Sequence, residues 1–362
     1  MLLGALSSCS EKIKEASPGK KIAEIYVTAL PGSKSVLVSL DGLWRVKPQV
    51  SWITTDVNGR EGKAAFTLFY ESNESDFANS NPTRKGAVVI ESLGTMTADT
   101  LYVIQQGIPD GKQYESTMDC SYLEFMDSAL KQRRIVYANF EDLEASESGL
   151  IVSWIKFYDI DILAAKCPAE LRANIYNGLE DTAKDLTNFN DETVFSRKSG
   201  IEFSDGISDP PTLTAKIDGL NFAISNFANK DPFNQESYSK IKSVLDFGYD
   251  RPGSDPQWFI GGSFYYLSMM ETGYPSTPSW FPTNPSDKHF EADRYAQNAN
   301  LIDCVSMTAK DFNITFSNGT DSWRADYVYA SSSAWNSVTA VNIINAPVAA
   351  MAHKPIMITI KY

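Results

Sequence analysis

The segment WRADYVYASSSAWNSV (Trp323–Val338), followed by APVAAMAHKPIMITIKY (Ala346–Tyr362), decides how the second half of the chain folds. Ala325–Ala330 and Ile356–Ile360 are apolar runs rich in aromatic or β-branched residues, which is typical of buried strands. Three polar side chains lie in or beside these strands, although the core of a sheet normally consists of apolar side chains: Arg324, Asp326 and His353. They are therefore candidate functional residues.

The arrangement resembles the C-terminus of the endonuclease/exonuclease/phosphatase family, in which an R-I-D-Y-I strand and an S-D-H-x-P turn carry catalytic residues. Arg324-Ala325-Asp326-Tyr327-Val328 matches the first motif, and Met351-Ala352-His353-Lys354-Pro355 keeps only part of the second. The resemblance implies that Ala352 replaces the aspartate that orients the catalytic imidazole. Because of this replacement, we consider whether the domain has lost the catalytic residues of the family at its other positions as well.

Length and charge limit the possible functions. A chain of 362 residues is too long for one typical domain and suits two. The net charge of −13 argues against a nucleic-acid partner, because a phosphate backbone is bound by basic surfaces. We expect no nucleic acid partner, and the oligomeric state is left open.

The first nineteen residues are predicted to be a targeting segment and a tether. Leu6-Ser7-Ser8-Cys9 resembles a bacterial lipobox, whose cysteine carries lipid, and the polar stretch 10–20 suits a flexible link. The alternative is a frayed terminus with a chance cysteine. The resemblance implies a lipoprotein of the cell envelope, held in the outer membrane through Cys9.

Residues 20–108 alternate short β-rich runs with turn residues, which predicts an all-β, immunoglobulin-like sandwich. Two of the predicted strands are Ser35–Leu40 and Trp44–Val46. The order of features resembles a BACON domain, a carbohydrate-binding module of Bacteroidetes: Ser51-Trp52-Ile53, an Arg at 84, Val88-Val89-Ile90 and Val103-Ile104-Gln105-Gln106-Gly107. The resemblance implies a glycan ligand. Trp44 and Trp52 lie in predicted strands and are expected to point into the core.

Residues 109–133 are predicted to be a connector with one helical stretch. Tyr122, Phe125, Met126 and Ala129/Leu130 recur at helical spacing, so we expect them to dock on a neighbouring surface.

From residue 134 to 362 strands and helices alternate. Helices are predicted over Leu150–Tyr158, Leu171–Leu186 and Glu236–Phe247, with buried strands between them. The resemblance implies an α+β architecture of four layers, two packed sheets flanked by helices.

The family's catalytic positions are largely replaced. The resemblance implies that Asn139 keeps the catalytic asparagine and that Cys167, beside Lys166, stands where a metal-binding glutamate is expected. It likewise places Asn226 at a histidine, Ser263 at an aspartate and Tyr265 at an asparagine. A thiol and an ammonium group are poor partners for Mg²⁺, which prefers oxygen ligands.

Composition supports the same interpretation. The chain has two histidines, His289 and His353, and only the second lies in a matching motif. We therefore predict a catalytically inactive domain with no metal and no cofactor, in which Asn139, Asp326 and His353 are vestigial. The alternative is an active, Mg²⁺-dependent phosphodiesterase or nuclease with rearranged ligands.

A proline-rich segment, Glu271–Phe290, follows the altered positions and carries Tyr274, Trp280 and Phe281. Exposed rigid aromatics suit sugar or protein recognition, whereas a loop folded back on the domain would bury them. With Asn226, Ser263 and Tyr265 they are the candidate ligand-binding residues. The predicted function is glycan binding or an accessory role in polysaccharide uptake, and a purely structural or protein-binding role is a further alternative.

The three cysteines other than Cys9 allow at most one disulfide, and none has metal-site spacing: Cys120, Cys167 and Cys304. They are interpreted as small buried side chains.

Overall fold

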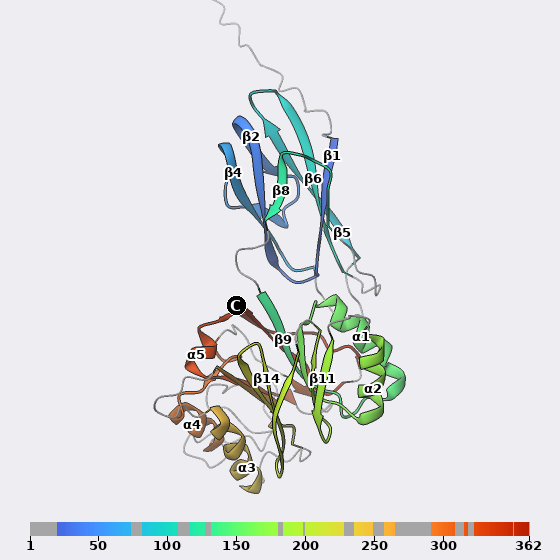
Figure 1. Cartoon of the computed structure of the whole chain (residues 1–362), viewed down its shortest axis with the longest axis vertical. Coiled ribbons are helices and arrows are strands. Elements are labelled where there is room, and N and C mark those ends of the chain that lie inside the picture. Colours follow the sequence, from blue (N-terminus) through green and yellow to red (C-terminus); the bar gives the residue numbers. More distant parts are fainter. Residues whose placement is uncertain are drawn as a thin grey trace, which may run out of the picture. The chain divides into compact units, whose positions relative to one another are not determined.

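A computed structural model describes residues 20–73, 82–107, 116–126, 132–179, 184–197, 200–227, 235–248, 257–264, 291–307, 315–317, 322–349 and 351–361. The fold divides into two compact units. The described parts of Met1–Asn73, Thr83–Gln106 and Tyr114–Ser128 form the first unit, and most of the remainder, from Ala129 to Tyr362, forms the second. Figure 1 shows both units.

The first unit consists of strands: β1 (Lys20–Val27), β2 (Gly32–Pro48), β3 (Ile53–Thr55), β4 (Gly59–Tyr70), β5 (Arg84–Ser92), β6 (Thr97–Gln105), β7 (Thr117–Met118) and β8 (Leu123–Met126). Their order is β3-β4-β2-β5-β6-β1-β7, and β8 pairs with β2. β1 runs parallel to β6, and every other pair in this unit is antiparallel. The predicted β-rich character of residues 20–108 is confirmed for the described strands.

A bend in β2 lets this one set of strands enclose a core. The sequence predicts two strands here, but β2 is a single strand with an irregular register between Ser39 and Leu43. Gly42 and, in β4, Gly62 have φ angles of 78° and 65°, which favour glycine. Val38 before the bend and Trp44 after it belong to the same buried cluster. The two halves of β2 therefore contribute to opposite sides of one core.

The residues that carry the BACON resemblance have structural contacts. The Arg84 guanidinium donates to Gln105 Oε1 at 2.9 Å and to the carbonyl of Glu71 at 2.9 Å, and it lies 4.2 Å from the Trp52 ring centroid. Gln105 is fully buried and donates to the carbonyls of Leu30 and Glu71. Trp44 is buried as predicted, whereas Trp52 precedes β3 and is only half-buried. These motif residues hold the fold together.

The predicted helix in 109–133 is wrong, because the described part of this segment forms β7 and β8. Leu123 is buried, Glu124 exposed, Phe125 half-buried and Met126 exposed, which is the alternation of a strand. β8 pairs with the first half of β2, from Val38 to Ser35. Ala129 and Leu130 lie outside the described residues.

The second unit contains two six-stranded sheets. The first has the order β11-β12-β10-β9-β22-β21 and the second β13-β14-β15-β16-β20-β17. The strands are β9 (Gln132–Asn139), β10 (Ile162–Lys166), β11 (Asp185–Phe189), β12 (Glu192–Ser196), β13 (Glu202–Ser208), β14 (Pro211–Ile217), β15 (Leu220–Ile224), β16 (Trp258–Ser263), β17 (Ile302–Asp303), β20 (Asp326–Ala330), β21 (Val338–Ile343) and β22 (Ile356–Lys361). A small pair, β18 (Phe316–Ser317) and β19 (Ser322–Trp323), stands apart from them.

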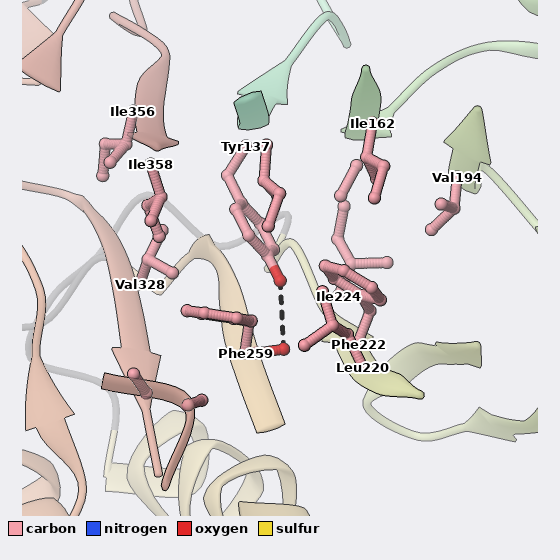
Figure 2. Close-up of a cluster of buried hydrophobic side chains, with 14 of the residues drawn as sticks. Tyr137, Ile162, Val194, Leu220, Phe222, Ile224, Phe259, Val328, Ile356 and Ile358 are labelled. Carbon is pink, nitrogen blue, oxygen red and sulfur yellow. Dashed lines mark hydrogen bonds between the residues drawn. The ribbon is translucent and has the colours of Figure 1, made fainter. Parts of the chain in front are cut away.

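The two sheets pack face to face around an apolar core (Figure 2). Ile162 and Ile358 of the first sheet lie in one buried cluster with Phe222 and Val328 of the second. Tyr137 crosses between the sheets, and its hydroxyl donates to the carbonyl of Phe259 at 3.0 Å. This bond satisfies the buried phenol, so a polar tip is tolerated in an apolar layer.

Helices lie beside the two sheets (Figure 1). They are α1 (Ser148–Phe157), α2 (Ala169–Gly178), α3 (Gln235–Leu245), α4 (Glu291–Asn298) and α5 (Ser332–Trp335), with 3₁₀ turns η1 (Ala145–Glu147) and η2 (Asp246–Gly248). Ile241 and Ala296, on α3 and α4, share a buried cluster with Tyr327 and Tyr329 of β20. α1 buries Trp154, whose indole N–H donates to the carbonyl of Asn345 at 2.7 Å. The second unit thus combines two packed sheets with helices, as predicted for an α+β fold.

Some predicted elements differ. The helix predicted over Leu171–Leu186 ends with α2 at Gly178, and Asp185–Phe189 is the edge strand β11 paired with β12. The described helices include none long and apolar enough to cross a membrane. Cys120, Cys167 and Cys304 are thiols and not disulfides, and Cys120 is half-buried instead of buried.

Candidate functional site

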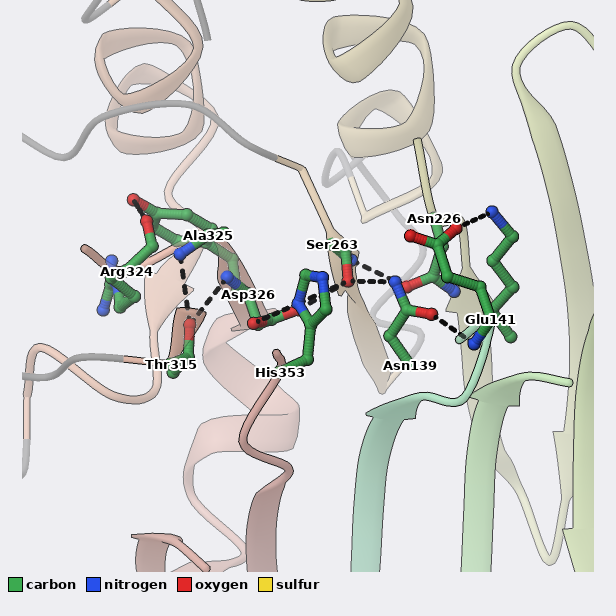
Figure 3. A network of polar contacts seen from close by, with 11 residues as sticks. Asn139, Glu141, Asn226, Ser263, Thr315, Arg324, Ala325, Asp326 and His353 are labelled. Carbon is green, nitrogen blue, oxygen red and sulfur yellow. Dashed lines mark hydrogen bonds and ion pairs between the residues drawn. The ribbon is translucent and has the colours of Figure 1, made fainter. Parts of the chain in front are cut away.

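Polar side chains from both sheets of the second unit meet at one edge of the inter-sheet core (Figure 3). Asn139 ends β9, Ser263 ends β16 and Asp326 begins β20, while His353 forms an isolated bridge with Phe316 shortly before β22. All four residues are buried. Asn139, Asp326 and His353, the family positions that the sequence keeps, therefore lie close together, and Ser263 joins them.

The Ser263 hydroxyl is the centre of this network. It donates to Asp326 Oδ1 at 2.5 Å and accepts from Asn139 Nδ2 at 3.0 Å. Its own backbone N–H donates to Asn226 Oδ1 at 2.8 Å. Ser263 is completely buried, so these contacts replace the water that its hydroxyl would otherwise bind.

His353 is oriented by Asp326. Its Nδ1 lies 2.9 Å from both carboxylate oxygens of Asp326. The family resemblance places the orienting aspartate at the position of Ala352, and this expectation is wrong. The partner comes from β20, which is adjacent in space and not in sequence, so the pair of histidine and aspartate survives in this chain.

A serine, a histidine and an aspartate in contact raise the possibility of nucleophilic catalysis. In a catalytic triad one imidazole nitrogen contacts the serine and the other contacts the aspartate. Here Ser263 Oγ, at 3.5 Å, and Asp326 both face Nδ1 of His353. Ser263 also donates its proton directly to Asp326. This arrangement cannot relay a proton from serine to histidine, so it is not a triad.

A second branch of the network crosses between the sheets through Asn226. Its backbone N–H donates to Glu192 Oε1 at 3.0 Å, and its side-chain Nδ2 donates to Glu192 Oε2 at 2.7 Å. Glu192 begins β12 and is buried, which raises its pKa to about 7 despite the Asn226 hydrogen bonds and the nearby charge of Lys166. Glu192 is not among the predicted site residues, because its only signal in the sequence is a glutamate at the start of an apolar run.

The side chain that reaches the site from β10 is Lys166 and not Cys167. Lys166 is in register with Asn139 on one side and Glu192 on the other, and it forms an ion pair with Glu141. The Glu141 N–H donates to Asn139 Oδ1 at 3.0 Å. Neighbouring residues of a strand point to opposite faces, so Cys167 faces away, and burial raises the pKa of its thiol to about 12. The expectation that Cys167 occupies the site is corrected accordingly.

Arg324 and Thr315 support β20 from its start. The Thr315 hydroxyl accepts from the backbone N–H groups of Ala325 at 3.1 Å and Asp326 at 3.0 Å. The Arg324 guanidinium is fully buried, pairs with Asp303 and lies 4.0 Å from the Tyr327 ring centroid. Arg324 therefore anchors the strand and does not contact the Ser263 network in any of these interactions.

The remaining candidates lie outside the described residues: Tyr265, Tyr274, Trp280, Phe281 and Cys9.

The described residues of this network do not fit a divalent cation. Among the described residues, no group of three or more His, Cys, Asp or Glu side chains could hold a metal ion. The carboxylates near the network have other partners: Glu141 binds the Lys166 ammonium, Glu192 binds Asn226 and Asp326 binds His353. Mg²⁺ requires several oxygen ligands in near-octahedral geometry, which an ammonium group at the same place opposes.

No known family profile matches the chain, and no curated protein matches it. Solved structures do match. An AP endonuclease from Archaeoglobus fulgidus is 14% identical over 62% of this chain and 98% of its own, with a TM-score of 0.47. An AP endonuclease from Leishmania major is 12% identical over 64% of this chain and 88% of its own, with a TM-score of 0.48. A 3′-5′ exonuclease from Neisseria meningitidis is 13% identical over 63% of this chain and 100% of its own, with a TM-score of 0.46.

These enzymes have the endonuclease/exonuclease/phosphatase fold. Because the identities and TM-scores are low, the similarity concerns the fold alone.

The raised pKa of Glu192 predicts a pH dependence of stability. A carboxyl whose folded pKa of about 7 exceeds its ordinary 4.5 keeps its proton more tightly in the folded state. The free energy of unfolding is then highest below the unfolded pKa and falls as pH rises through 7, by about 3 kcal/mol at most. Urea unfolding between pH 5 and 8 should show this loss.

Glu192→Gln cannot ionise and should remove this slope, although it also loses one of the two hydrogen bonds to Asn226. Glu170→Gln, at an exposed carboxylate in α2, is the matched control and should keep the wild-type slope. A slope in Glu192→Gln equal to that of the wild type would contradict the assignment.

Proposed function

We propose that this protein is a non-catalytic binding protein, in which an endonuclease/exonuclease/phosphatase-like unit no longer hydrolyses phosphoesters. We further propose that it is a lipid-anchored protein of the cell envelope that binds glycan or assists polysaccharide uptake. The observation that carries the first proposal is the closed hydrogen bonding of the site. Ser263 binds Asn139 and Asp326, and Lys166 binds Glu141, so the polar groups at the altered positions bind one another.

This closure opposes hydrolysis for two physical reasons. Attack on a phosphoester requires positive charge concentrated at the phosphoryl oxygens and a positioned water. The Lys166 charge is instead neutralised by Glu141, and the Ser263 hydroxyl, which stands where the resemblance places an aspartate, is a weaker base and donates to Asp326. Loss of one general acid or base alone costs roughly 10²–10⁴-fold in rate.

The glycan and membrane parts rest on the sequence. The BACON resemblance of 20–108 supports a carbohydrate ligand, and the lipobox-like Leu6–Cys9 supports the anchor. In the site, neutral hydrogen bonds join Asn139, Asn226 and Ser263. The neighbouring carboxyl groups of Asp326 and Glu192 oppose a phosphate more than a neutral polyol.

The catalytic proposal is tested by turnover of bis(p-nitrophenyl) phosphate with Mg²⁺ or Mn²⁺. We expect the wild type to equal His353→Ala, with neither above the rate of buffer. Metal-dependent turnover that His353→Ala abolishes would establish the alternative, a phosphodiesterase with rearranged ligands. A glycan array on full-length Cys9→Ala protein then separates glycan binding from a purely structural or protein-binding role, which predicts no bound glycan.

The anchor predicts a difference in membrane fractionation. The wild type should sediment with the envelope, and Cys9→Ala should be released, because no described helix could replace the lipid. A wild-type protein recovered entirely in the soluble fraction would refute the anchor without affecting the catalytic proposal.

A further inference from the structure

A cavity of about 460 Å³ opens on the outer face of the second sheet, away from the inter-sheet network. Its wall includes Asp293 and Gln297 of α4, Leu301 and Met307 in the segment that contains β17, and Tyr329 of β20. Tyr329 and Tyr327 belong to the cluster under α3 and α4, whereas Val328 between them faces the inter-sheet core. The cavity and the Ser263 network therefore lie on opposite faces of β20.

One residue of the wall, Tyr329, carries a polar group that the described part of the fold does not satisfy. The Tyr329 side chain is 1% exposed, and its hydroxyl has no hydrogen-bond partner in the part of the chain that the structure describes. An unsatisfied buried hydroxyl costs roughly 1–3 kcal/mol. Its strand neighbour Tyr327 is also buried, but its hydroxyl donates to the carbonyl of Arg324 at 3.2 Å. Burial raises the pKa of Tyr329, so the phenol keeps a proton to donate.

The charges of the described wall disfavour anionic ligands. The lining residues that the structure describes include two aspartates, Asp293 and Asp303, and no lysine, arginine or histidine. Asp303 is neutralised by Arg324, and its oxygens also accept from Ser306. Asp293 is 2% exposed and accepts from Gln297 Nε2 at 3.2 Å. A phosphate or carboxylate placed here would meet negative charge without a cation on the wall.

The rest of the wall mixes apolar and neutral polar groups. Leu301, Ile302 and Met307 supply apolar surface, and Met307 is 62% exposed. Gln297 and Asn300 supply amides, which both donate and accept hydrogen bonds. A few polar anchors on an apolar wall, in a volume of this size, are usual for small-molecule sites.

We propose that this cavity binds a neutral, hydroxyl-bearing molecule of mono- or disaccharide size, with the Tyr329 phenol donating a hydrogen bond to it. The ligand supplies the acceptor that the fold lacks, while the amides of Gln297 and Asn300 bind further hydroxyls. The inference goes beyond the proposed function, because it assigns a site on the other face of β20 and depends neither on the anchor nor on the loss of catalysis.

The test compares Tyr329→Phe with its matched control Tyr327→Phe, which removes a satisfied hydroxyl from the same face of the same strand. Without ligand, Tyr329→Phe should keep or raise the melting temperature, and Tyr327→Phe should lower it. Isothermal titration with glucose, galactose, mannose, N-acetylglucosamine, maltose and cellobiose then measures binding. For the sugar that binds the wild type, Tyr329→Phe should weaken affinity by roughly tenfold. Tyr327→Phe should change it by less than about twofold.

Three outcomes overturn the inference. The first is that none of these sugars binds, and the second is that inorganic phosphate binds with an affinity that Tyr329→Phe reduces. The third is that a sugar binds the wild type and Tyr329→Phe equally, which would place glycan binding elsewhere and leave the proposed function standing. A phosphodiesterase activity in the wild type would refute the proposed function without bearing on this cavity.

Discussion

Arg324→Ala is expected to lower the free energy of unfolding of the second unit by about 3–5 kcal/mol. The guanidinium is fully buried, donates to Asp303 and Ser306, and lies over the Tyr327 ring. Its removal leaves the Asp303 carboxylate, of which only 11% is exposed, without its cation. Urea unfolding followed by tryptophan fluorescence measures the loss.

Arg133→Ala is the matched control for this ion pair. Arg133 pairs with Asp218, whose side chain is 48% exposed and stays hydrated when the arginine is lost, so we expect a cost of about 1 kcal/mol. Replacing both partners, as Arg324→Met with Asp303→Leu, should recover most of the loss, because no buried charge is then left. Similar costs for Arg324→Ala and Arg133→Ala would show that burial of the pair is not what matters.

Gly262→Ala should destabilise the second unit by about 4 kcal/mol and disrupt the Ser263 network. Gly262 has a φ of 149°, and a Cβ added there would lie 1.9 Å from the backbone oxygen of Ser225. The obstacle is the backbone that follows β15 and not a movable side chain. Relief requires β15 and β16 to separate, which displaces the Ser263 N–H from Asn226.

The matched control is Gly149→Ala in α1, where an added Cβ meets nothing within 4 Å. Alanine favours a helix, so this variant should gain roughly 0.5–1 kcal/mol. The contact between Asn226 and Ser263 can be followed in Gly262→Ala through the amide NMR signal of Ser263. An unchanged signal, or unchanged stability, would show that the strand tolerates a side chain at this position.

The family resemblance places Asn139, Asp326 and His353 at one site, and the positions of the strand ends explain why they meet there. Asn139, Ser263 and Asp326 each lie at an end of a strongly apolar run, and such ends meet at one edge when sheets pack. Two assignments fail. One depends on which face of a strand a side chain points to, and the other depends on which strands are neighbours in space. A shift of one residue reverses the face of a strand, so Lys166 reaches the network and Cys167 does not. His353 finds its carboxylate on β20, which no local motif reveals.

Two elements were mispredicted for a related reason. Asp185–Phe189 continues a helical pattern, yet it forms β11 because the edge of β12 offers a full ladder of partners. The apolar residues around Leu123–Met126 fit helical spacing, but burial also alternates along this segment. Pairing with β2 stabilises the strand. In short segments tertiary hydrogen bonds outweigh local preference.

The parallel pairing of β1 with β6 has a mechanical consequence. The described chain enters the first unit at Lys20, beside Asp99, and β8 leaves it at Met126, beside Ser35 near the opposite end of the strands. Tension between these two points pulls β1 along its own length. The hydrogen bonds of the β1–β6 ladder are then loaded in shear and must yield together, whereas a strand pulled sideways opens one bond at a time. The rate of forced unfolding depends on the free-energy barrier to breaking this ladder, so we expect the first unit to resist tension applied along its strands.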